Sequence, residues 1–535
     1  MSSVRRTVAN VRKFSQGQSA SLPFVLAILD GWGVTKPGQV DDPTAKARTP
    51  FLHELHHNYS SALLGAHGTF VGLPHEQDGN SEAGHLNLGA GRIVEQESVV
   101  ISRSIKDGTF FKNTALLSAA AHLKRHHSQW HMMGLLSNYN SGHSSPDHFF
   151  ALLKFAQQQK ISQVYIHFFT DGRDSPKYDA LKFITEARKR FRNGEIIASV
   201  TGRFYAMDRK KEWSRTGRTY DLLTQGKGMT DTSPEEAVRH AYNRGESDEF
   251  VSPTVITDKK HHPLGIIQPD DVVVYWNLRS DRARQLAKPF AQKRFEELNP
   301  GAFKRQKLLK DLCFVALTDF GPDLGSILTS FPSRDLVDTL PMVLKDLRQL
   351  YVAESEKFAH ITYFFNGGYD HPVGGEDRLV VPSPNVASYD LRPAMSALAI
   401  TRVVNQALAK RRYDFIGVNF ANPDMIGHTG NLRACIKAME VVDGCLAQIG
   451  GLVHKLGGAM LVTADHGNVE ETLNPATGEI DTEHSKNPVP CLLYHPAWRG
   501  KSFVRRSGVL GDVAPTILSL LGLPKPRAMT RQGLL

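Results

Sequence analysis

The stretch that decides the fold is Phe24-Val-Leu-Ala-Ile-Leu29, six apolar residues that run directly into Asp30-Gly-Trp-Gly33. A short apolar run that ends in a polar, glycine-containing turn is typical of a strand buried on both faces. Comparable runs, separated by longer amphipathic stretches, lie at 164–169, 196–200, 272–276, 361–365, 415–419 and 460–463. This alternation predicts an α/β protein with mainly parallel sheets.

Each of these runs leads into a cluster rich in charged residues or glycine. The clusters lie at 30–33, 171–174, 202–203, 279–282, 366–368, 424–428 and 465–467. In open parallel sheets, ligands bind just beyond the carboxyl ends of the strands, where such loops gather. A structural protein has little reason to place carboxylates, histidines and arginines there, so the pattern favours an enzyme.

The length and composition limit the class of protein. A chain of 535 residues exceeds the size at which one hydrophobic core keeps growing, so we expect two domains. With 41% hydrophobic and 22% charged residues and no apolar stretch near the roughly 20 residues of a membrane span, we expect a soluble protein without membrane contact. The net charge of +10 suggests nucleic-acid binding, but the basic residues are spread along the chain, so we expect none.

Two features bear on the compartment. The four cysteines form no CxxC pair, which fits neither a zinc knuckle nor a disulfide framework and indicates a reducing compartment. Residues 1–23 carry arginines and a lysine among serines without an acidic residue. An organelle transit peptide has that composition, and so does a disordered basic tail. We favour the tail, since the segment lacks apolar periodicity, and expect a cytoplasmic protein.

The order of the clusters predicts an insertion. Candidate metal ligands occur early and late in the chain, whereas the arginine-rich loops lie mostly between them. A chain that begins one domain, builds a second and then returns gives this order. We therefore predict a metal domain at 24–95 and 330–535, and an inserted α/β domain at 96–329.

Acidic and histidine residues in separate segments predict a metal centre. Asp424 and His428 are four residues apart and share a face if the segment is helical. Asp465 and His466 directly follow an apolar run, and Asp30 and His484 complete the set. Mixed oxygen and imidazole ligands suit Mn²⁺, Zn²⁺ or Co²⁺ better than Mg²⁺. Two such cations can activate a nucleophile and hold a phosphoryl oxygen.

Ser81, in Gly79-Asn-Ser-Glu-Ala-Gly-His-Leu-Asn-Leu-Gly89, stands at an expected helix start. One interpretation is a helix N-cap, the common role of serine there. The other is a nucleophile, because helix N-terminal amides also favour phosphate. No GxSxG motif surrounds it, so its activation would come from a metal.

Eight motifs, in order, resemble those of the 2,3-bisphosphoglycerate-independent phosphoglycerate mutases. They are LDGWG (29–33), GNSEAGHLNLGAGR (79–92), DGRD (171–174), GRFYAMDR (202–209), NLRSDRARQL (277–286), EKFAHITYFFNGG (356–368), NPDMIGHTG (422–430) and TADHGN (463–468). The resemblance runs from about residue 24 to the C-terminus. It implies an alkaline phosphatase-like metal domain with an inserted substrate-binding (transferase) domain.

The resemblance also implies residue roles. One metal would be bound by Asp30, Ser81, Asp465 and His466, and the other by Asp424, His428 and His484. The family usually uses Mn²⁺, with Mg²⁺, Co²⁺ or Zn²⁺ in some members, and no 2,3-bisphosphoglycerate. The substrate contacts would be His143, Arg173, Asp174, Arg203, Arg209, Arg279, Arg282 and Lys357. The segment around His143 and the Glu483-His484-Ser485 triplet differ from the usual family sequence.

The implied reaction is the interconversion of 3-phosphoglycerate and 2-phosphoglycerate, a step of glycolysis and gluconeogenesis, by a monomer. Ser81 would form a phosphoserine, Lys357 would neutralise charge on the phosphoryl oxygens, and Asp174 would move protons. Other readings stay open: a phosphatase, phosphopentomutase or sulfatase-like hydrolase of the same superfamily, or a non-catalytic anion-binding protein. A sulfatase normally needs a CxPxR-type motif, which is absent around Ser81.

Overall fold

The computed structural model describes residues 22–35, 42–139, 141–192, 194–332, 336–474 and 477–535. The chain divides into two compact units: unit 1, Met1–Gln96 with Asp335–Leu535, and unit 2, Glu97–Arg334. The sequence-based boundaries fall close to the first junction and a few residues before the second. The tail expected at 1–23 lies almost wholly outside the described residues. No helix in the described ranges is both long and apolar enough to cross a membrane.

Unit 1 is built on an eight-stranded sheet with β1 (Phe24–Leu29) near its centre. β1 pairs in parallel with β13 (Phe415–Phe420) and β14 (Ala459–Thr463), and β11 (Gln349–Glu354) pairs in parallel with β13. β12 (Asp377–Val381) continues the sheet beyond β11. On the other side β15 (Val489–Tyr494) runs antiparallel to both β14 and β2 (Ser60–Gly65), and β16 (Ser507–Val509) closes that edge. All six residues of β1 are buried, as the apolar run predicts.

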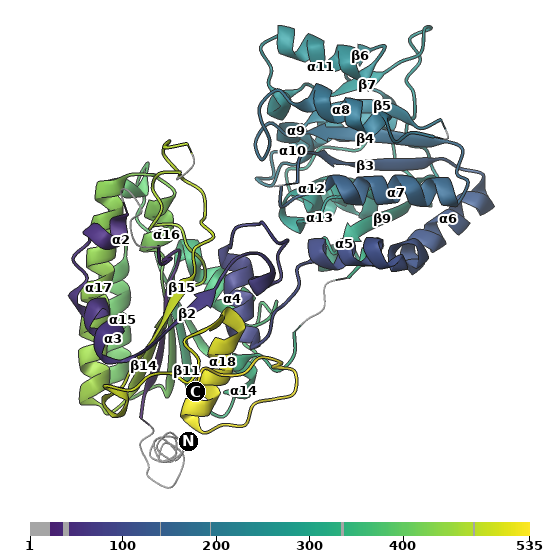
Figure 1. Cartoon of the computed structure of the whole chain (residues 1–535). Helices are drawn as coiled ribbons and strands as arrows, with labels where there is room; N and C mark the ends of the chain where they lie inside the picture. The colour runs from purple at the N-terminus through teal and green to yellow at the C-terminus, as the bar shows by residue number, and fades with distance from the viewer. Residues whose placement is uncertain (1–21, 36–41, 140, 193, 333–335, 475–476) are drawn as a thin grey trace. The chain divides into compact units, whose positions relative to one another are not determined.

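Helices cover both faces of this sheet (Figure 1). The long α17 (Leu432–Lys455) packs with α15 (Ala397–Ala409), α3 (Pro50–Asn58) and α2 (Pro43–Lys46). α4 (Ser81–Ala90) packs with α18 (Val513–Leu521) and α14 (Leu340–Val343). α16 (Asn422–Gly427) follows β13 and packs against α17. One apolar core, which includes β1, fills the space between these layers.

Unit 2 is a second eight-stranded sheet, in the order β10-β9-β8-β3-β4-β5-β7-β6. β3 (Trp130–Leu136), β4 (Val164–Thr170), β5 (Ile196–Gly202), β8 (Val272–Tyr275), β9 (Cys313–Thr318) and β10 (Leu328–Phe331) are parallel neighbours. Among the described strands of unit 2, β7 (Thr254–Ile256) alone pairs antiparallel, with β5, and β6 (Met229–Asp231) runs parallel to β7.

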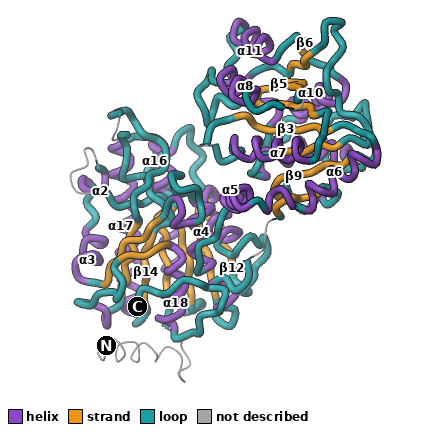
Figure 2. The backbone as a smooth tube through the Cα atoms, turned by 45° about the vertical axis from the view of Figure 1, so that its right-hand side comes forward, coloured by secondary structure: helices purple, strands orange, loops and turns teal. Residues whose placement is uncertain are grey.

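The helices of unit 2 also lie on two faces (Figure 2 shows the strands in orange). α5 (Glu97–Asp107), α6 (Thr114–His126), α7 (Pro146–Gln158), α8 (Ala180–Arg188) and α11 (Pro234–Asn243) share one core; α10 (Trp213–Gln225) and α12 (Ser280–Ala291) share the other. Along β3, Met132 enters the first core and Met133 the second. This is the two-residue alternation of a strand buried on both faces.

One of the seven expected strands is wrong. Residues 361–364 lie in a short π-helical segment, His360–Phe364, and Phe365 is its C-cap, although their β-branched and aromatic composition favours a strand. The strand in this part of the chain is β11, which ends at Glu354, and the helical segment His360–Phe364 follows it. Its residues Ile361 and Phe365 are buried in the core of unit 1, which shows that tertiary packing overrides the local propensity. The other six runs are strands.

Candidate active site

Ser81 is the first residue of α4 and is not its cap. Asn80 is the N-cap, and its side-chain oxygen accepts a hydrogen bond from the backbone N–H of Ala83 at 2.9 Å. The N-cap interpretation of Ser81 is therefore wrong. Because Asn80 satisfies the helix end, the Ser81 hydroxyl is available for other contacts.

The Ser81 hydroxyl lies at the centre of a buried polar cluster in unit 1. Its Oγ is 3.1 Å from Asp30 Oδ1, 2.9 Å from His466 Nε2 and 2.7 Å from Lys357 Nζ. Asp30 follows β1, and His466 follows the adjacent β14. Ser81 itself is only 5% exposed. The geometry thus surrounds one hydroxyl with a carboxylate, an imidazole and an ammonium group.

Lys357 enters this cluster from the short helical turn Ser355–Lys357 that follows β11. Its Nζ lies 2.7 Å from Asp30 Oδ1 and 2.6 Å from Asp424 Oδ2. Burial alone would lower the pKa of Lys357, but Asp30, Asp424 and Asp465 raise it above the usual range. The side chain is therefore a fixed cation beside Ser81.

Asp424, His428 and His484 form one group of close donor atoms. Asp424 lies in α16 and His428 is its C-cap, so the helical spacing expected for this pair is confirmed. Asp424 Oδ1 is 3.4 Å from His428 Nε2 and 3.3 Å from His484 Nε2, and the two Nε2 atoms are 3.2 Å apart. The other nitrogens are bound to backbone carbonyls, His428 Nδ1 to Thr482 and His484 Nδ1 to Gly79. This leaves the two Nε2 atoms aimed at the same carboxylate.

The remaining expected ligands lie alongside. His466 Nε2 is 3.6 Å from Asp30 Oδ1 and 3.6 Å from Asp465 Oδ2. Asp30, Asp424 and His466 form a further close group, so the two expected sites are adjacent. All seven residues expected to hold metal thus lie in unit 1 around Ser81. Their roles as ligands remain predictions.

Several residues that the sequence reasoning missed support this cluster. His85 and Asn419 contact Asp465 and Asp30, respectively. Asn468 donates to Asp424 Oδ1 at 2.7 Å. Glu470 accepts from the backbone N–H groups of Gly33 and Asn468 and from Ser485. His85 could have been found, because it is one helical turn from Ser81 and shares its face.

In unit 2, a buried ion pair joins the loops after β4 and β5. Arg203 is 3% exposed and its Nη1 contacts Asp171 and, at 3.0 Å, Asp174 Oδ2. Asp171 also accepts from the backbone N–H groups of Arg173 and Asp174 and from Ser137. Asp171 therefore connects the loop after β4 to the residues after β5 through Arg203. Asp171 was not among the expected site residues, although it opens the quoted DGRD motif.

The other arginines of the set gather near this pair. Burial lowers the pKa of Arg282, and the nearby guanidinium groups of Arg203, Arg209 and Arg173 lower it further. Arg209 pairs with Asp281 at 2.8 Å, and Arg173 lies 3.8 Å from Glu249. Several guanidinium groups thus lie close enough to lower the pKa of a neighbouring arginine, an arrangement that suits a multiply charged anion.

His143 lies in the same cluster. It is buried, and its carbonyl accepts from the backbone N–H of Leu278, next to Arg279. Burial, with the charges of Arg203 and Arg279, lowers the pKa of His143 to about 3. The backbone N–H of His143 and the carboxylate of Asp174 both bind the hydroxyl of Ser141. Every residue expected to contact substrate, except Lys357 of unit 1, thus belongs to this arginine cluster in unit 2.

Comparison with known proteins gives consistent matches. Residues 22–525 match the family model described as Metalloenzyme superfamily. The chain is 44% identical to the 2,3-bisphosphoglycerate-independent phosphoglycerate mutase of Chloroflexus aggregans and 45% identical to phosphoglycerate mutase 1 of that type from Methanosarcina barkeri; both comparisons cover 96% of this chain and 98% of the relative. It is also similar to crystal structures of Leishmania mexicana phosphoglycerate mutase at low cobalt concentration, with 28% identity, a TM-score of 0.75 and coverage of 95% of this chain and 97% of the other.

Proposed function

We propose that the chain interconverts 3-phosphoglycerate and 2-phosphoglycerate through a phosphoserine at Ser81, because it belongs to the 2,3-bisphosphoglycerate-independent phosphoglycerate mutases. These belong to the metalloenzyme superfamily. The observation that carries the proposal is the position of the Ser81 Oγ among Asp30, His466 and Lys357. A structural serine at a helix start needs no such partners.

The donor set of unit 1 fits two divalent cations. It combines buried carboxylates with imidazole nitrogens whose opposite ring nitrogens are fixed by backbone carbonyls, the usual support for a metal-binding histidine. Asp424, His428 and His484 would hold one cation, and Asp30, Ser81, Asp465 and His466 the other. Mixed oxygen and nitrogen donors suit Mn²⁺, Zn²⁺ or Co²⁺, and from the family resemblance we propose Mn²⁺, with Co²⁺, Zn²⁺ or Mg²⁺ as substitutes. Cations held there would lower the pKa of the serine hydroxyl and neutralise phosphoryl charge.

The residues of unit 1 would perform the transfer. Ser81 Oγ attacks phosphorus, and the bond from phosphorus to the glycerate oxygen breaks in line with it. Lys357, held as a cation beside Ser81, donates hydrogen bonds to the phosphoryl oxygens as charge develops on them. The N-terminal amides of α4 favour the phosphate that Ser81 then carries.

The arginine cluster of unit 2 would retain glycerate between the two transfers. Its guanidinium groups can bind the carboxylate of the intermediate in a bidentate way. Asp174 lies beside Arg203, which keeps it ionised, and its oxygen accepts from Ser141. We assign it the proton transfers between the two glycerate hydroxyls, which exchange roles as acceptor of the phosphoryl group. Water at this stage would hydrolyse the phosphoserine, so retention of glycerate distinguishes a mutase from a phosphatase.

Other properties follow from the same proposal. We expect a monomer, because one chain supplies all the groups named above. We expect a cytoplasmic location, in line with four cysteines that form no disulfide in the described structure.

The deciding experiment is a coupled assay of 2-phosphoglycerate formation without added 2,3-bisphosphoglycerate. We expect full activity with Mn²⁺, none after chelation, and recovery when Mn²⁺ is restored. Inorganic phosphate should be measured in the same reactions. Release of phosphate without 2-phosphoglycerate would show a phosphatase, and activity that survives chelation would contradict the metal assignment.

A further inference from the structure

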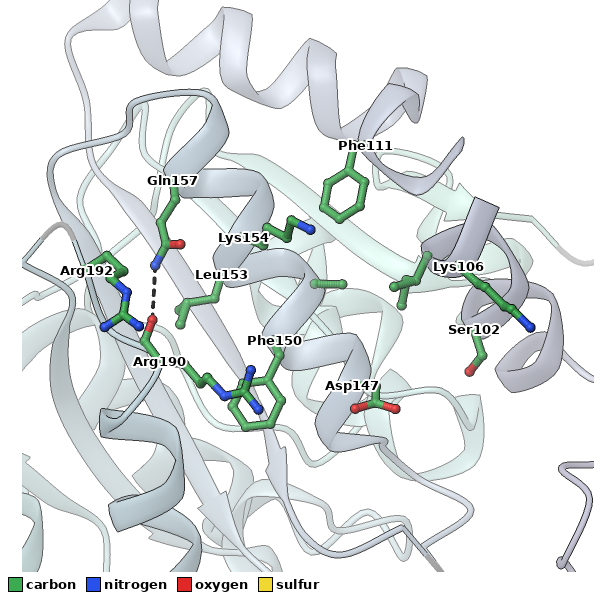
Figure 3. Close-up of a pocket in the computed structure, with 12 residues that line it drawn as sticks. Ser102, Lys106, Phe111, Asp147, Phe150, Leu153, Lys154, Gln157, Arg190 and Arg192 are labelled. Atoms are coloured by element: carbon green, nitrogen blue, oxygen red, sulfur yellow. Dashed lines mark hydrogen bonds between the residues drawn. The ribbon is translucent and has the colours of Figure 1, made fainter. Parts of the chain in front are cut away.

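Unit 2 contains a cavity of about 560 Å³ that shares no residue with the arginine cluster (Figure 3). It lies among α5, α7, the residue Phe111 that precedes α6, and the segment after α8. The residues that matter for its chemistry are Lys106, Phe111, Phe150, Lys154, Arg190 and Arg192. Its volume is within the range of about 300–1,000 Å³ typical of small-molecule sites.

The charge of the cavity is strongly positive. Four cationic side chains line it, Lys106, Lys154, Arg190 and Arg192, against the single carboxylate of Asp147. Asp147 already accepts a hydrogen bond from the hydroxyl of Tyr139 at 3.0 Å. Within the described ranges, no ion pair within 4.0 Å joins any of the four cations to a carboxylate. Four exposed cations that line one hollow without such an ion pair favour a ligand with several negative charges spread along its length.

The floor of the cavity is apolar and aromatic. Leu153 and Ala151 are buried there, and the phenyl rings of Phe111 and Phe150 also line the cavity. Lys154 Nζ lies over the ring of Phe111 and the guanidinium of Arg190 over the ring of Phe150, each at 5.2 Å from the centroid. Figure 3 shows Arg190 lying across Phe150. A guanidinium beside an aromatic ring can also stack on a planar ring of a ligand.

The walls are held in place by the protein itself. Gln157 of α7 donates from Nε2 to the Arg190 carbonyl at 3.2 Å and to Glu195 Oε1 at 2.7 Å. Glu195 Oε2 accepts from the backbone N–H of Arg192 at 2.8 Å. The segment that carries both arginines is thus tied to α7, so a ligand would find its partners already arranged.

We propose that this cavity is a nucleotide site, in which the phosphates lie against the lysines and arginines and the base stacks on the Arg190–Phe150 pair. A bare polyphosphate would use the cations but not the aromatic floor. The cavity also adjoins the segment that carries His143, since α7 begins three residues after it and Tyr139 contacts Asp147. A bound nucleotide would therefore lie beside Asp147, whose partner Tyr139 is four residues before His143 of the arginine cluster.

The test is calorimetric titration of the Mn²⁺-loaded protein with ATP in excess Mg²⁺ and saturating 3-phosphoglycerate, which occupies the catalytic site. We expect one ATP per chain, and an affinity at least about tenfold lower in the Lys154→Ala/Arg190→Ala variant. The matched control is Lys182→Ala/Arg239→Ala, which removes the same charge from exposed positions of unit 2 outside the cavity and should bind ATP normally.

A second pair of titrations separates the base from the phosphates. Phe150→Leu keeps an apolar side chain and should weaken ATP binding while leaving binding of inorganic tripolyphosphate unchanged. Tripolyphosphate that binds wild type as tightly as ATP would overturn the nucleotide assignment. Absence of ATP binding at millimolar concentration, or equal binding by wild type and the Lys154→Ala/Arg190→Ala variant, would overturn the site.

Discussion

Asn419 holds His85 in a single orientation: its Nδ2 lies 3.0 Å from His85 Nε2 and 2.7 Å from Asp30 Oδ2. On the other edge of the ring, His85 Nδ1 lies 2.9 Å from the Ser81 carbonyl and 3.1 Å from Asp465 Oδ2. A carbonyl only accepts, so Nδ1 carries the proton and Nε2 accepts from the amide of Asn419. His85 is close enough to Asp30 and Asp465 to be taken for a ligand, but both its nitrogens are occupied. It therefore positions two residues together: Ser81, the proposed nucleophile, and Asp465, a proposed metal ligand.

This relationship predicts different results for two substitutions of His85. Asn can place an amide N–H where Nδ1 was, so His85→Asn should keep most of the Mn²⁺ affinity. His85→Leu removes the donor and should weaken Mn²⁺ binding by about 10–100-fold, the usual cost of losing such support. Competition against a chelating dye measures both. Equal affinity in the two variants would contradict the positioning role.

Substitution of Ser81 tests the nucleophile directly. Ser81→Ala should abolish both mutase activity and any trapped phosphoserine, because no other described hydroxyl has the same three partners. The loss of one buried hydroxyl should change the free energy of unfolding by only about 1 kcal/mol. Activity and phosphorylation are read by the coupled assay and by intact mass. A variant with normal turnover would exclude the covalent route.

The Asn80 cap links the stability of α4 to catalysis. Asn80→Ala removes the bond to Ala83 and should cost about 1 kcal/mol, and it should also lower kcat, because Ser81 is the next residue. Ser233→Ala is the control: Ser233 caps α11 through the backbone N–H of Glu236. It should cost a similar stability and leave kcat unchanged. Comparable kcat values in the two variants would mean that the cap does not position Ser81.

Asp171 should act on substrate affinity through Arg203. Asp171→Asn removes the charge that Arg203 contacts and weakens acceptance from the backbone N–H groups of Arg173 and Asp174. We expect KM for 3-phosphoglycerate to rise about tenfold with a smaller change in kcat. Asp281→Asn, which affects the more exposed pair with Arg209, should raise KM less. A larger rise in KM in Asp281→Asn than in Asp171→Asn would contradict the role assigned to Asp171.

The sequence predicted the strands of the sheets better than it predicted the contacts between side chains in the site. The run at 24–29 is a strand because six consecutive apolar residues need burial on both faces, and the loop after it carries Asp30 as expected. The run at 361–365 misled because composition alone does not separate a buried strand from a buried helical turn. The pairing of Arg203 with Asp171, and of His85 with Asn419, depends on side chains from distant segments. No local pattern contains that information.

A buried histidine in unit 2 predicts sensitivity to acid. Burial lowers the pKa of His148 to about 4, and its Nε2 contacts the hydroxyl of Ser102 at 3.0 Å. The unfolded chain takes up this proton below about pH 6.5, whereas the folded protein does so only near pH 4, so unfolding becomes easier as pH falls between these values. The shift corresponds to about 3 kcal/mol lost by pH 4. His131 and His167, also buried with lowered pKa, act in the same direction.

His148→Gln isolates this contribution, because its side-chain amide can still reach Ser102 but takes up no proton. Hydrogen exchange of β3 and α7, followed by mass spectrometry at pH values between 7 and 4.5, reports the opening free energy of unit 2 in place. We expect a weaker pH dependence in His148→Gln than in wild type, and no change in His262→Gln, which alters an exposed histidine of the same unit. His148→Gln and wild type could instead lose protection from hydrogen exchange to the same extent as the pH falls. Other groups would then take up the protons that destabilise unit 2, and the assignment to His148 would be wrong.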